Sequence, residues 1–333
     1  MRIATYNVEW FTNLFNDKGE IQADDEWSSR YNVTRAQQVE AIAKVMTALD
    51  ADAIMIIEAP DAHRHRSGQV ALETFAKAFG LRAQRAILGF ENQTQQEIAL
   101  LYDPDALTVI HDPRADGGPP FDQSYRIDLD VDARPEDVRW SKPPLELQCT
   151  SNSGSAFRMI GVHAKSKAPH GAKGREAILR ASIENRRKQL AQCIWLRRRV
   201  AAHLDAGDPL VVLGDFNDGP GLDEYEKLFG RSGVEIVLGE GEDVHLREPH
   251  AEMALQRRLG AAPTSARFYI SQQKRWLEVL LDYIMVSPGL MALKPDWRIW
   301  HPFDDPHCYA HIELREALLA ASDHFPVTLD IDL

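Results

Sequence analysis

The sequence comprises 333 residues, of which 44% are hydrophobic and 26% are charged, and its formal net charge at pH 7 is −12. This composition is typical of one large or two ordinary globular domains and excludes disordered, collagen-like and coiled-coil chains. The acidic charge argues against a protein that coats nucleic acid electrostatically, and no apolar run of about 18 residues predicts a membrane span. Because Met1 and Arg2 lead directly into a strand-like segment rather than a signal peptide, we expect a monomeric, cytoplasmic protein without membrane insertion.

The first half of the chain predicts strands that alternate with amphipathic helices. Thr34 and Gln37 have the spacing of a capping box, and the apolar residues Val39, Ile42 and Met46 that follow predict a helix. A second amphipathic helix is expected near 70–79. Strands are predicted at 1–10, 53–60, 97–102, 107–110, 145–149 and 157–163.

The second half predicts fewer but longer elements. These are a long helix at about 175–204, a buried strand at 209–217, a short helical piece at 222–229, and strands at 278–287 and 324–333. We expect long loops near 112–144, 164–175 and 239–275, and long loops on a rigid scaffold usually carry specificity. No internal repeat and no shift in composition marks a second domain, so the sequence predicts a single domain over 1–333.

Polar side chains suited to metal or phosphate chemistry lie at the ends of several apolar runs. In "LVVLGDFNDGP", pleat geometry places Asp215 and Asn217 on one face and Phe216 on the other, although Gly, Asn, Asp and Pro are also ordinary turn residues. Strand ends in one packed core can converge on one pocket. The candidate set is Asn7, Glu58, His163, Asp215, Asn217, Asp282, Asp323 and His324.

Carboxylate and amide oxygens are ligands for Mg²⁺ or Mn²⁺ rather than for zinc. Mg²⁺ usually takes one or two protein carboxylates and keeps waters or substrate oxygens, and Glu58 and Asp323 can supply that pair. The other candidates can orient water and bind phosphate, which are the requirements of metal-assisted phosphoryl transfer.

The motifs "YN", "IIEAP", "GDFN", "LDYIMVS" and "SDHFPV" follow one another from Asn7 to His324. With these motifs in this order, the sequence resembles the endonuclease/exonuclease/phosphatase superfamily, which is deoxyribonuclease-I-like. The resemblance implies an α/β (α+β) fold, a four-layer α/β/β/α sandwich of two packed, mainly antiparallel sheets flanked by helices. It also implies a single site at one end of the sandwich.

The resemblance further implies a metal site with Mg²⁺, for which Mn²⁺ can substitute. Glu58 would bind the metal directly, Asn7 would lie beside it or orient a ligand, and Asp323 would complete the environment of this metal or of a second metal.

The catalytic roles implied by the resemblance fall on five residues. Asp215 would orient or deprotonate the attacking water, and Asn217 would hold a phosphate oxygen. His324, held by Asp282, would contact the scissile phosphate as a donor. His163 would bind phosphate or protonate the leaving group.

Substrate contacts are expected from basic and aromatic residues near the long loops. Eleven Lys and Arg against two Glu give the segment from His163 to Arg199 a charge of +9, although a solvated helix face explains most of these side chains equally well. The substrate-binding candidates are Lys165 and Arg186, from an "H-x-K-S … R" pattern, and Tyr125, Arg126 and Lys142. Lys142 stands where many relatives have Arg, which puts that contact in doubt.

The His- and Asp-rich segment 301–311 permits two interpretations. His301, Asp304, Asp305, His307 and His311 could suggest a second metal site, but their spacing matches no defined site, and a polar surface loop is the better prediction.

Three functions remain open at this point. The preferred hypothesis is an Mg²⁺-dependent nuclease that hydrolyses phosphodiester bonds of nucleic acid by in-line attack of water. The alternative is a phosphatase or phosphodiesterase for a small phosphorylated or lipid substrate. A lipid substrate would predict an exposed aromatic hairpin or a basic amphipathic surface helix, and neither is clear in the sequence. A non-catalytic scaffold is disfavoured, since every titratable residue that the mechanism needs is present.

Overall fold

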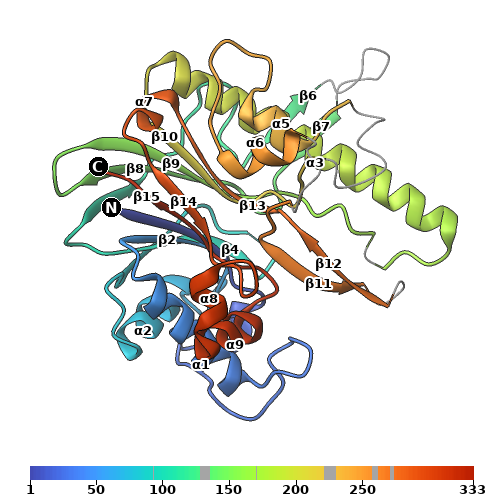
Figure 1. Cartoon of the computed structure of the whole chain (residues 1–333). Coiled ribbons are helices and arrows are strands. Elements are labelled where there is room, and N and C mark those ends of the chain that lie inside the picture. Colours follow the sequence, from blue (N-terminus) through green and yellow to red (C-terminus); the bar gives the residue numbers. More distant parts are fainter. Residues whose placement is uncertain (93, 128–135, 170, 221–229, 257–261, 271–273) are drawn as a thin grey trace.

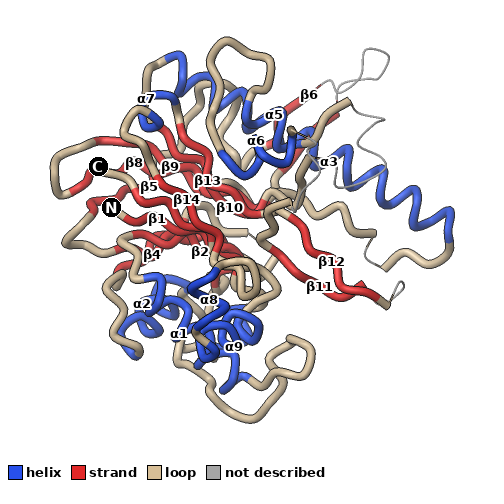
Figure 2. Tube along the Cα trace, viewed as in Figure 1, coloured by secondary structure: helices blue, strands red, loops and turns tan. Residues whose placement is uncertain are grey.

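The computed structural model describes residues 1–333 except 93, 128–135, 170, 221–229, 257–261 and 271–273. Its centre is two stacked β-sheets with helices on both outer faces (Figures 1 and 2). The first sheet has the order β14 (Asp296–Ile299), β15 (Val327–Asp330), β1 (Arg2–Asn7), β2 (Ala53–Ala59), β4 (Glu97–Tyr102) and β3 (Arg85–Leu88). The second has the order β13 (Asp282–Val286), β10 (Leu210–Asp215), β9 (Ala156–His163), β8 (Leu145–Ser151) and β5 (Leu107–His111).

Most neighbouring strands in these sheets are antiparallel. The pairs β1–β2 and β9–β10 are parallel. Along β1, Ile3 faces the second sheet, whereas Ala4 and Tyr6 face the helices on the other side. This period of two is what a strand buried on both faces requires. The predicted four-layer sandwich is therefore confirmed.

Helices cover each sheet on its outer face. The first sheet packs against α1 (Arg35–Leu49), α2 (Gly68–Ala78) and α9 (Ile312–Ala321), with α8 (Pro306–Ala310) and the 3₁₀ helix η1 (Phe11–Leu14) beside them. The second packs against α3 (Arg175–Asp205) and α5 (Gly233–Leu238), near α6 (Pro249–Leu255); α7 (Pro288–Met291) follows β13. The capping box predicted at Thr34 and Gln37 is present at the start of α1. Among the helices of the described part of the chain, none is long and apolar enough to cross a membrane.

The predicted loops contain more regular structure than expected. Segment 112–144 carries the hairpin β6 (Ser124–Ile127) and β7 (Glu136–Arg139), and segment 239–275 carries α6, β11 (Ala266–Ile270) and the start of β12 (Arg275–Val279). The strand predicted at 278–287 is interrupted at 280–281, between β12 and β13. The short strands β3 and β14 and the helices α8 and α9 were not predicted. The helical piece predicted at 222–229 lies outside the described residues.

Candidate active site

Three neighbouring strands of the second sheet end in polar side chains at the same level. Asp215 on β10 pairs in register with His163 on β9 and with Asp282 on β13. From the first sheet, Asn7 at the end of β1 reaches across, and its Nδ2 donates to Asp215 Oδ2 at 3.0 Å. The convergence of strand ends expected from the sequence is thus present, and both sheets contribute to it.

The carboxylate of Asp215 is buried and held on several sides. Its Oδ1 accepts from the backbone N–H of Asn217 at 2.7 Å, and its Oδ2 accepts from Nδ2 of Asn217 at 3.0 Å. The same Oδ2 lies 3.7 Å from Nε2 of His163 and 4.0 Å from Nε2 of His324. Burial raises the pKa of Asp215 to about 7, although the charge of His324 opposes the shift. A carboxylate fixed in this way is ionised at or just above neutral pH, which suits a base.

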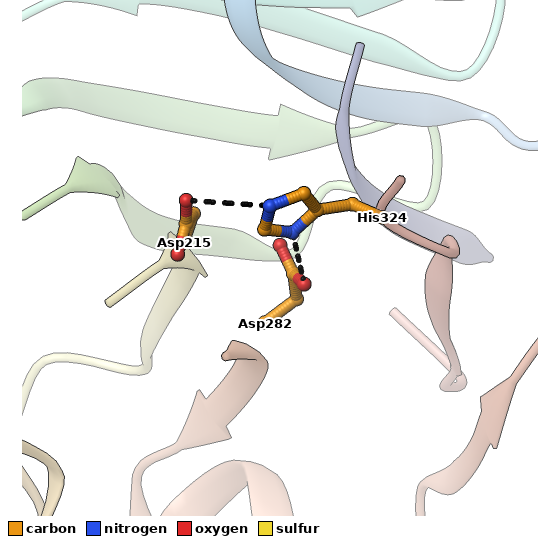
Figure 3. Close-up of side chains that lie close together, drawn as sticks. All are labelled: Asp215, Asp282 and His324. Atoms are coloured by element: carbon orange, nitrogen blue, oxygen red, sulfur yellow. Dashed lines mark hydrogen bonds and ion pairs between the residues drawn. The ribbon is translucent and has the colours of Figure 1, made fainter. Parts of the chain in front are cut away.

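His324 and Asp282 form a buried pair (Figure 3). Nδ1 of His324 lies 2.8 Å from Asp282 Oδ2, and the hydroxyl of Ser265 donates to the same oxygen at 2.8 Å. Burial lowers the pKa of His324, but the carboxylates of Asp282 and Asp215 outweigh it and raise the pKa well above its ordinary value. His324 is therefore protonated at neutral pH and directs Nε2 toward Asp215.

The turn after β10 explains why Asp215 and Asn217 are neighbours. Asn217 has φ +50°, so its backbone is not extended. The sequence analysis correctly placed Asp215 and Asn217 close together, but the cause is a turn rather than the pleat of a strand. Its N–H bond to Asp215 closes a turn of the kind that Asp side chains form with the backbone two residues on. Phe216 is fully buried, as expected, and its backbone oxygen accepts from Gln189 Nε2 of α3 at 3.1 Å.

Glu58 reaches the site through a distortion of β2. The pairing of β2 with β4 shifts register between Ile57 and Ala59, and Glu58 between them has φ +63°. Such a bulge re-aims a side chain, and strained backbone of this kind is concentrated at functional sites. The carboxylate accepts from the N–H of Trp10 at 3.2 Å. Burial raises the pKa of Glu58, opposed by Lys142.

An acidic group that the sequence analysis missed lies beside Glu58. Burial and the charge of Asp323 raise the pKa of Glu9 to about 7, opposed by its ion pair with Arg30, and Glu58 raises it further. Asp323 in turn lies 4.0 Å from His324, measured from Oδ1 to Nε2. The signal was available, because Glu9 stands two positions after Asn7 in "YNVEW".

The acidic side chains Glu9, Glu58 and Asp323 are of the chemical type that binds a divalent cation. Asn7 Oδ1 is buried and has no hydrogen-bond partner among the described residues. The charges of Asp323 and Glu58 raise the pKa of Glu9, and the charge of Asp323 raises the pKa of Glu58, which a bound cation would relieve. Asp215, Asp282 and His324 also place one potential ligand atom each within 4.8 Å of one another. That second grouping is the weaker fit, since His324 is protonated and already bonded to Asp282.

Lys142, one of the predicted substrate-binding residues, contacts a candidate catalytic residue, His163. Its Nζ is 3.2 Å from each ring nitrogen of His163. Burial lowers the pKa of Lys142, while Glu58 and Asp215 oppose the shift. Burial, Lys142 and His324 together lower the pKa of His163 well below its ordinary value, so this imidazole is neutral.

The other basic residues of the "H-x-K-S … R" pattern take different places. Arg186 is 1% exposed, and its guanidinium lies 3.6 Å from Oδ1 of the buried Asp218, which Lys167 also contacts. Arg186 therefore supports the turn after β10 from beneath, and direct substrate contact does not fit its burial. Lys165 is half-buried, and its N–H donates to Gln192 Oε1 at 2.9 Å.

Tyr125 and Arg126 both lie on β6. The ring of Tyr125 packs edge-on against Trp195 with 5.2 Å between centroids, and its hydroxyl accepts from Arg198, so this side chain contacts α3. Arg126 is exposed. Because both of these contacts of Tyr125 are with α3, they do not support the prediction that its ring contacts the substrate.

Segment 301–311 is neither a second metal site nor wholly a surface loop. His301 is 3% exposed, and its Nδ1 accepts from the N–H of Asp304 at 3.0 Å and of Phe303 at 3.2 Å. Asp305 caps α8, accepting from the N–H of Cys308 at 2.8 Å. These polar side chains terminate turns and a helix, and within the described residues they form no group of three metal ligands.

Comparisons with known proteins agree with this geometry. The model of the Endonuclease/Exonuclease/phosphatase family matches residues 4–324. The structure is similar to that of the 3′ phosphatase NExo from Neisseria bound to product DNA hairpin, with 18% identity, 100% of each chain covered and a TM-score of 0.52. It is also similar to truncated Caenorhabditis elegans TDP2, with 12% identity, 98% of this chain and 96% of that chain covered, and a TM-score of 0.51.

No curated protein sequence matches the chain. The two structural similarities, both below 25% identity, show the fold alone. The family match extends over nearly the whole sequence, which confirms the resemblance inferred from the motifs. This chain therefore belongs to the endonuclease/exonuclease/phosphatase family, whose members hydrolyse phosphoester bonds and typically depend on a divalent metal.

Proposed function

We propose that this protein is an Mg²⁺-dependent phosphodiesterase that cleaves nucleic acid by in-line attack of water. The observation that carries the proposal is the position of Asp215. Two amides fix its carboxylate, and two histidines, His163 and His324, lie within 4.0 Å of its Oδ2. Hydrolysis of a phosphoester needs a base that accepts a proton from water and a donor that stabilises the phosphate, and Asp215 and His324 can supply these two groups.

Asn7, Glu58 and Asp323 would hold the metal, and Glu9, whose pKa responds to the charges of Glu58 and Asp323, would join them directly or through water. When bound, the cation supplies charge neutralisation and polarises a phosphate oxygen. Asp215 accepts a proton from the attacking water, and protonated His324 donates to a non-bridging phosphate oxygen. Asn217 donates its two Nδ2 hydrogens to Asp215 Oδ2 and to the carbonyl of Ala164, so its role is to hold the base rather than the phosphate. Asp282 keeps His324 charged and oriented, as an acidic partner does for a catalytic histidine.

Lys142 and His163 form the other side of the proposed site. Two cationic groups, Lys142 and His324, border neutral His163, so this side chain can donate a hydrogen bond toward the leaving oxygen without adding charge. A buried Lys also complements the negative charge that develops on the phosphate. Lys142 stands where many relatives have arginine. A lysine supplies a compact positive charge, whereas an arginine would donate two parallel hydrogen bonds to the phosphate.

The test is hydrolysis of supercoiled plasmid, single-stranded DNA, RNA and bis(4-nitrophenyl) phosphate in Mg²⁺ or Mn²⁺, with EDTA and Asp215→Ala as controls. Metal-dependent cleavage of nucleic acid that both controls abolish is the expected result. Hydrolysis of the small diester without cleavage of any nucleic acid would keep the mechanism and overturn the substrate. Wild-type activity in Asp215→Ala would refute the assignment of the base.

A further inference from the structure

The β11–β12 hairpin begins at the candidate site and extends beyond the ends of both sheets (Figure 1). At its base, Ser265 holds Asp282, and Ala266 forms an antiparallel bridge with His324. The next residue, Arg267, donates its N–H to the carbonyl of Asp323 at 2.7 Å. The first residues of β11 are therefore attached to the site, and the position of the hairpin is fixed relative to His324.

One face of this hairpin is aromatic and solvent-exposed. Tyr269 pairs in register with Trp276, and Arg267 with Glu278, so these four side chains share a face. The rings of Tyr269 and Trp276 lie 5.5 Å apart and are 50% and 55% exposed. Arg267 lies over Trp276 at 4.9 Å and over the ring of Phe303 at 4.9 Å. The opposite face of the hairpin is apolar and packs into its own small core.

We propose that the exposed pair Tyr269 and Trp276 stacks on an unpaired nucleobase of the strand whose scissile phosphate lies at Asp215 and His324. This inference rests on the proposed function and names its substrate as nucleic acid with a single-stranded segment or end. Tyr269 stands three residues beyond Ala266, and a strand advances roughly 3.3 Å per residue. The rings therefore lie about 10 Å from His324, within one or two nucleotides of the cleaved bond. Aromatic faces of this kind bind bases without regard to sequence.

The sequence of the hairpin tip favours a nucleic acid over a membrane, whereas the cations of the hairpin would attract either polyanionic surface. Residues 266–279 carry Arg267, Lys274 and Arg275 against Glu278 alone, in a chain whose net charge is −12. A local excess of cations on an acidic protein attracts a polyanion to that surface. The sequence between the two strands is Ser-Gln-Gln-Lys, which has no apolar residue to insert between lipid chains.

The experiment measures binding and turnover separately. Fluorescence anisotropy of a labelled single-stranded oligonucleotide in EDTA reports binding without chemistry, for the wild type, Trp276→Ala, Tyr269→Ala and Trp276→Phe. Stacking of one base on an aromatic ring predicts a rise in Kd of at least about five-fold in the two alanine variants, with most of the affinity recovered in Trp276→Phe. With metal, the ratio of kcat/KM for the oligonucleotide to that for bis(4-nitrophenyl) phosphate falls by a similar factor.

Tyr309→Ala is the matched control, because Tyr309 is 56% exposed and also carries an arginine, Arg315, over its ring at 5.3 Å. It lies on α8, and its removal is expected to leave oligonucleotide binding unchanged. Equal affinity of Trp276→Ala and the wild type would overturn the proposal. Binding of wild-type protein to phosphatidylcholine–phosphatidylserine vesicles that depends on Trp276, without binding to the oligonucleotide, would also overturn it. A wild type that hydrolyses no ester refutes the proposed function instead, whatever the anisotropy shows.

Discussion

Asp282 acts on the reaction only through His324, so its substitution separates orientation and charge from direct contact. Asp282→Asn keeps the shape but removes the carboxylate that raises the pKa of His324. We expect kcat at pH 7 to fall by about 10²-fold or more, the usual range for loss of an acid–base partner. The protonated imidazole is then lost as pH rises through the lowered pKa. The ratio of variant to wild-type activity should therefore decrease with increasing pH between about 5 and 8.

Asp305→Asn serves as the control for this measurement. Asp305 is a half-buried aspartate that pairs with an arginine, Arg298, at 2.8 Å, but it is the N-cap of α8. Its replacement is expected to lower the free energy of unfolding without altering the pH profile of kcat. A constant activity ratio across this pH range in Asp282→Asn would show that Asp282 is structural.

Glu9 provides a second prediction at the scale of single residues, in this case for the metal-free protein. Its pKa is raised to about 7, so the folded state binds this proton more tightly than the unfolded chain does. The cost of ionising Glu9 is absent below the unfolded pKa of about 4.3 and is complete once the pH exceeds the folded pKa. In EDTA, Glu9→Gln should therefore gain stability relative to the wild type as the pH rises from about 4 to 8, by roughly 1–3 kcal/mol.

Urea unfolding of both proteins across this pH range measures the difference. Glu184→Gln is a suitable control, because Glu184 is an exposed residue of α3 whose pKa is lowered by its ion pair with Lys188, so its pH dependence should have the opposite sign. A Glu9→Gln difference that is independent of pH would contradict the buried, repulsive environment assigned to this carboxylate.

At the scale of elements, the close approach of β9 and β10 determines where His163 and Asp215 lie. Gly214 has φ +138°, and a Cβ built on it would lie 2.0 Å from the carbonyl oxygen of Val162. Gly214→Ala must therefore separate the two strands at the residues that precede His163 and Asp215. We expect a loss of about 2–4 kcal/mol in the free energy of unfolding, together with a fall in kcat.

Gly289→Ala is the comparison variant, since a Cβ there meets no atom within 4 Å and Gly289 lies in the short helix α7. It should be neutral or slightly stabilising, because alanine favours helix over glycine. Urea unfolding and single-turnover kinetics distinguish the two variants. Gly214→Ala with wild-type stability would mean that β9 and β10 tolerate a wider spacing than the structure implies.

Periodicity in the sequence located the long elements but not the features that aim side chains. The strand at 53–60 was predicted, yet nothing in its apolar pattern indicates the bulge that turns Glu58 toward the site, because a bulge depends on the pairing with β4. The left-handed Asn217 was likewise read as extended. The β11–β12 hairpin was missed since its aromatic alternation is interrupted by polar residues and it is held by Asp323 and His324 before β15, which are distant in sequence.

For the whole molecule, the motifs predicted more than periodicity did, because each one lies at the end or the start of a strand at the same edge of the sandwich. The chain order from Asn7 to His324 could therefore predict the layers and the site together. It could not show that Arg186 is buried or that Tyr125 faces α3. The sequence alone does not distinguish an arginine or a tyrosine on the surface from one that is buried. Burial depends on packing of α3 against the second sheet, which no local pattern specifies.

The same architecture predicts that metal binding and global stability are coupled. Asn7 and Glu58 belong to the first sheet, whereas the Asp215 that Asn7 contacts belongs to the second, so the site exists only while the two sheets are packed. A cation that binds only this folded arrangement should raise the free energy of unfolding by about 2.7 kcal/mol at a concentration 100 times its Kd. Thermal unfolding in increasing Mg²⁺ is expected to show this rise in the wild type and to lose it in Glu58→Gln, while Glu313→Gln, an exposed carboxylate on α9, retains it. Were the Tm of the wild type independent of Mg²⁺ under conditions where hydrolysis requires it, the cation would have to enter with the substrate rather than bind to a site formed by the fold.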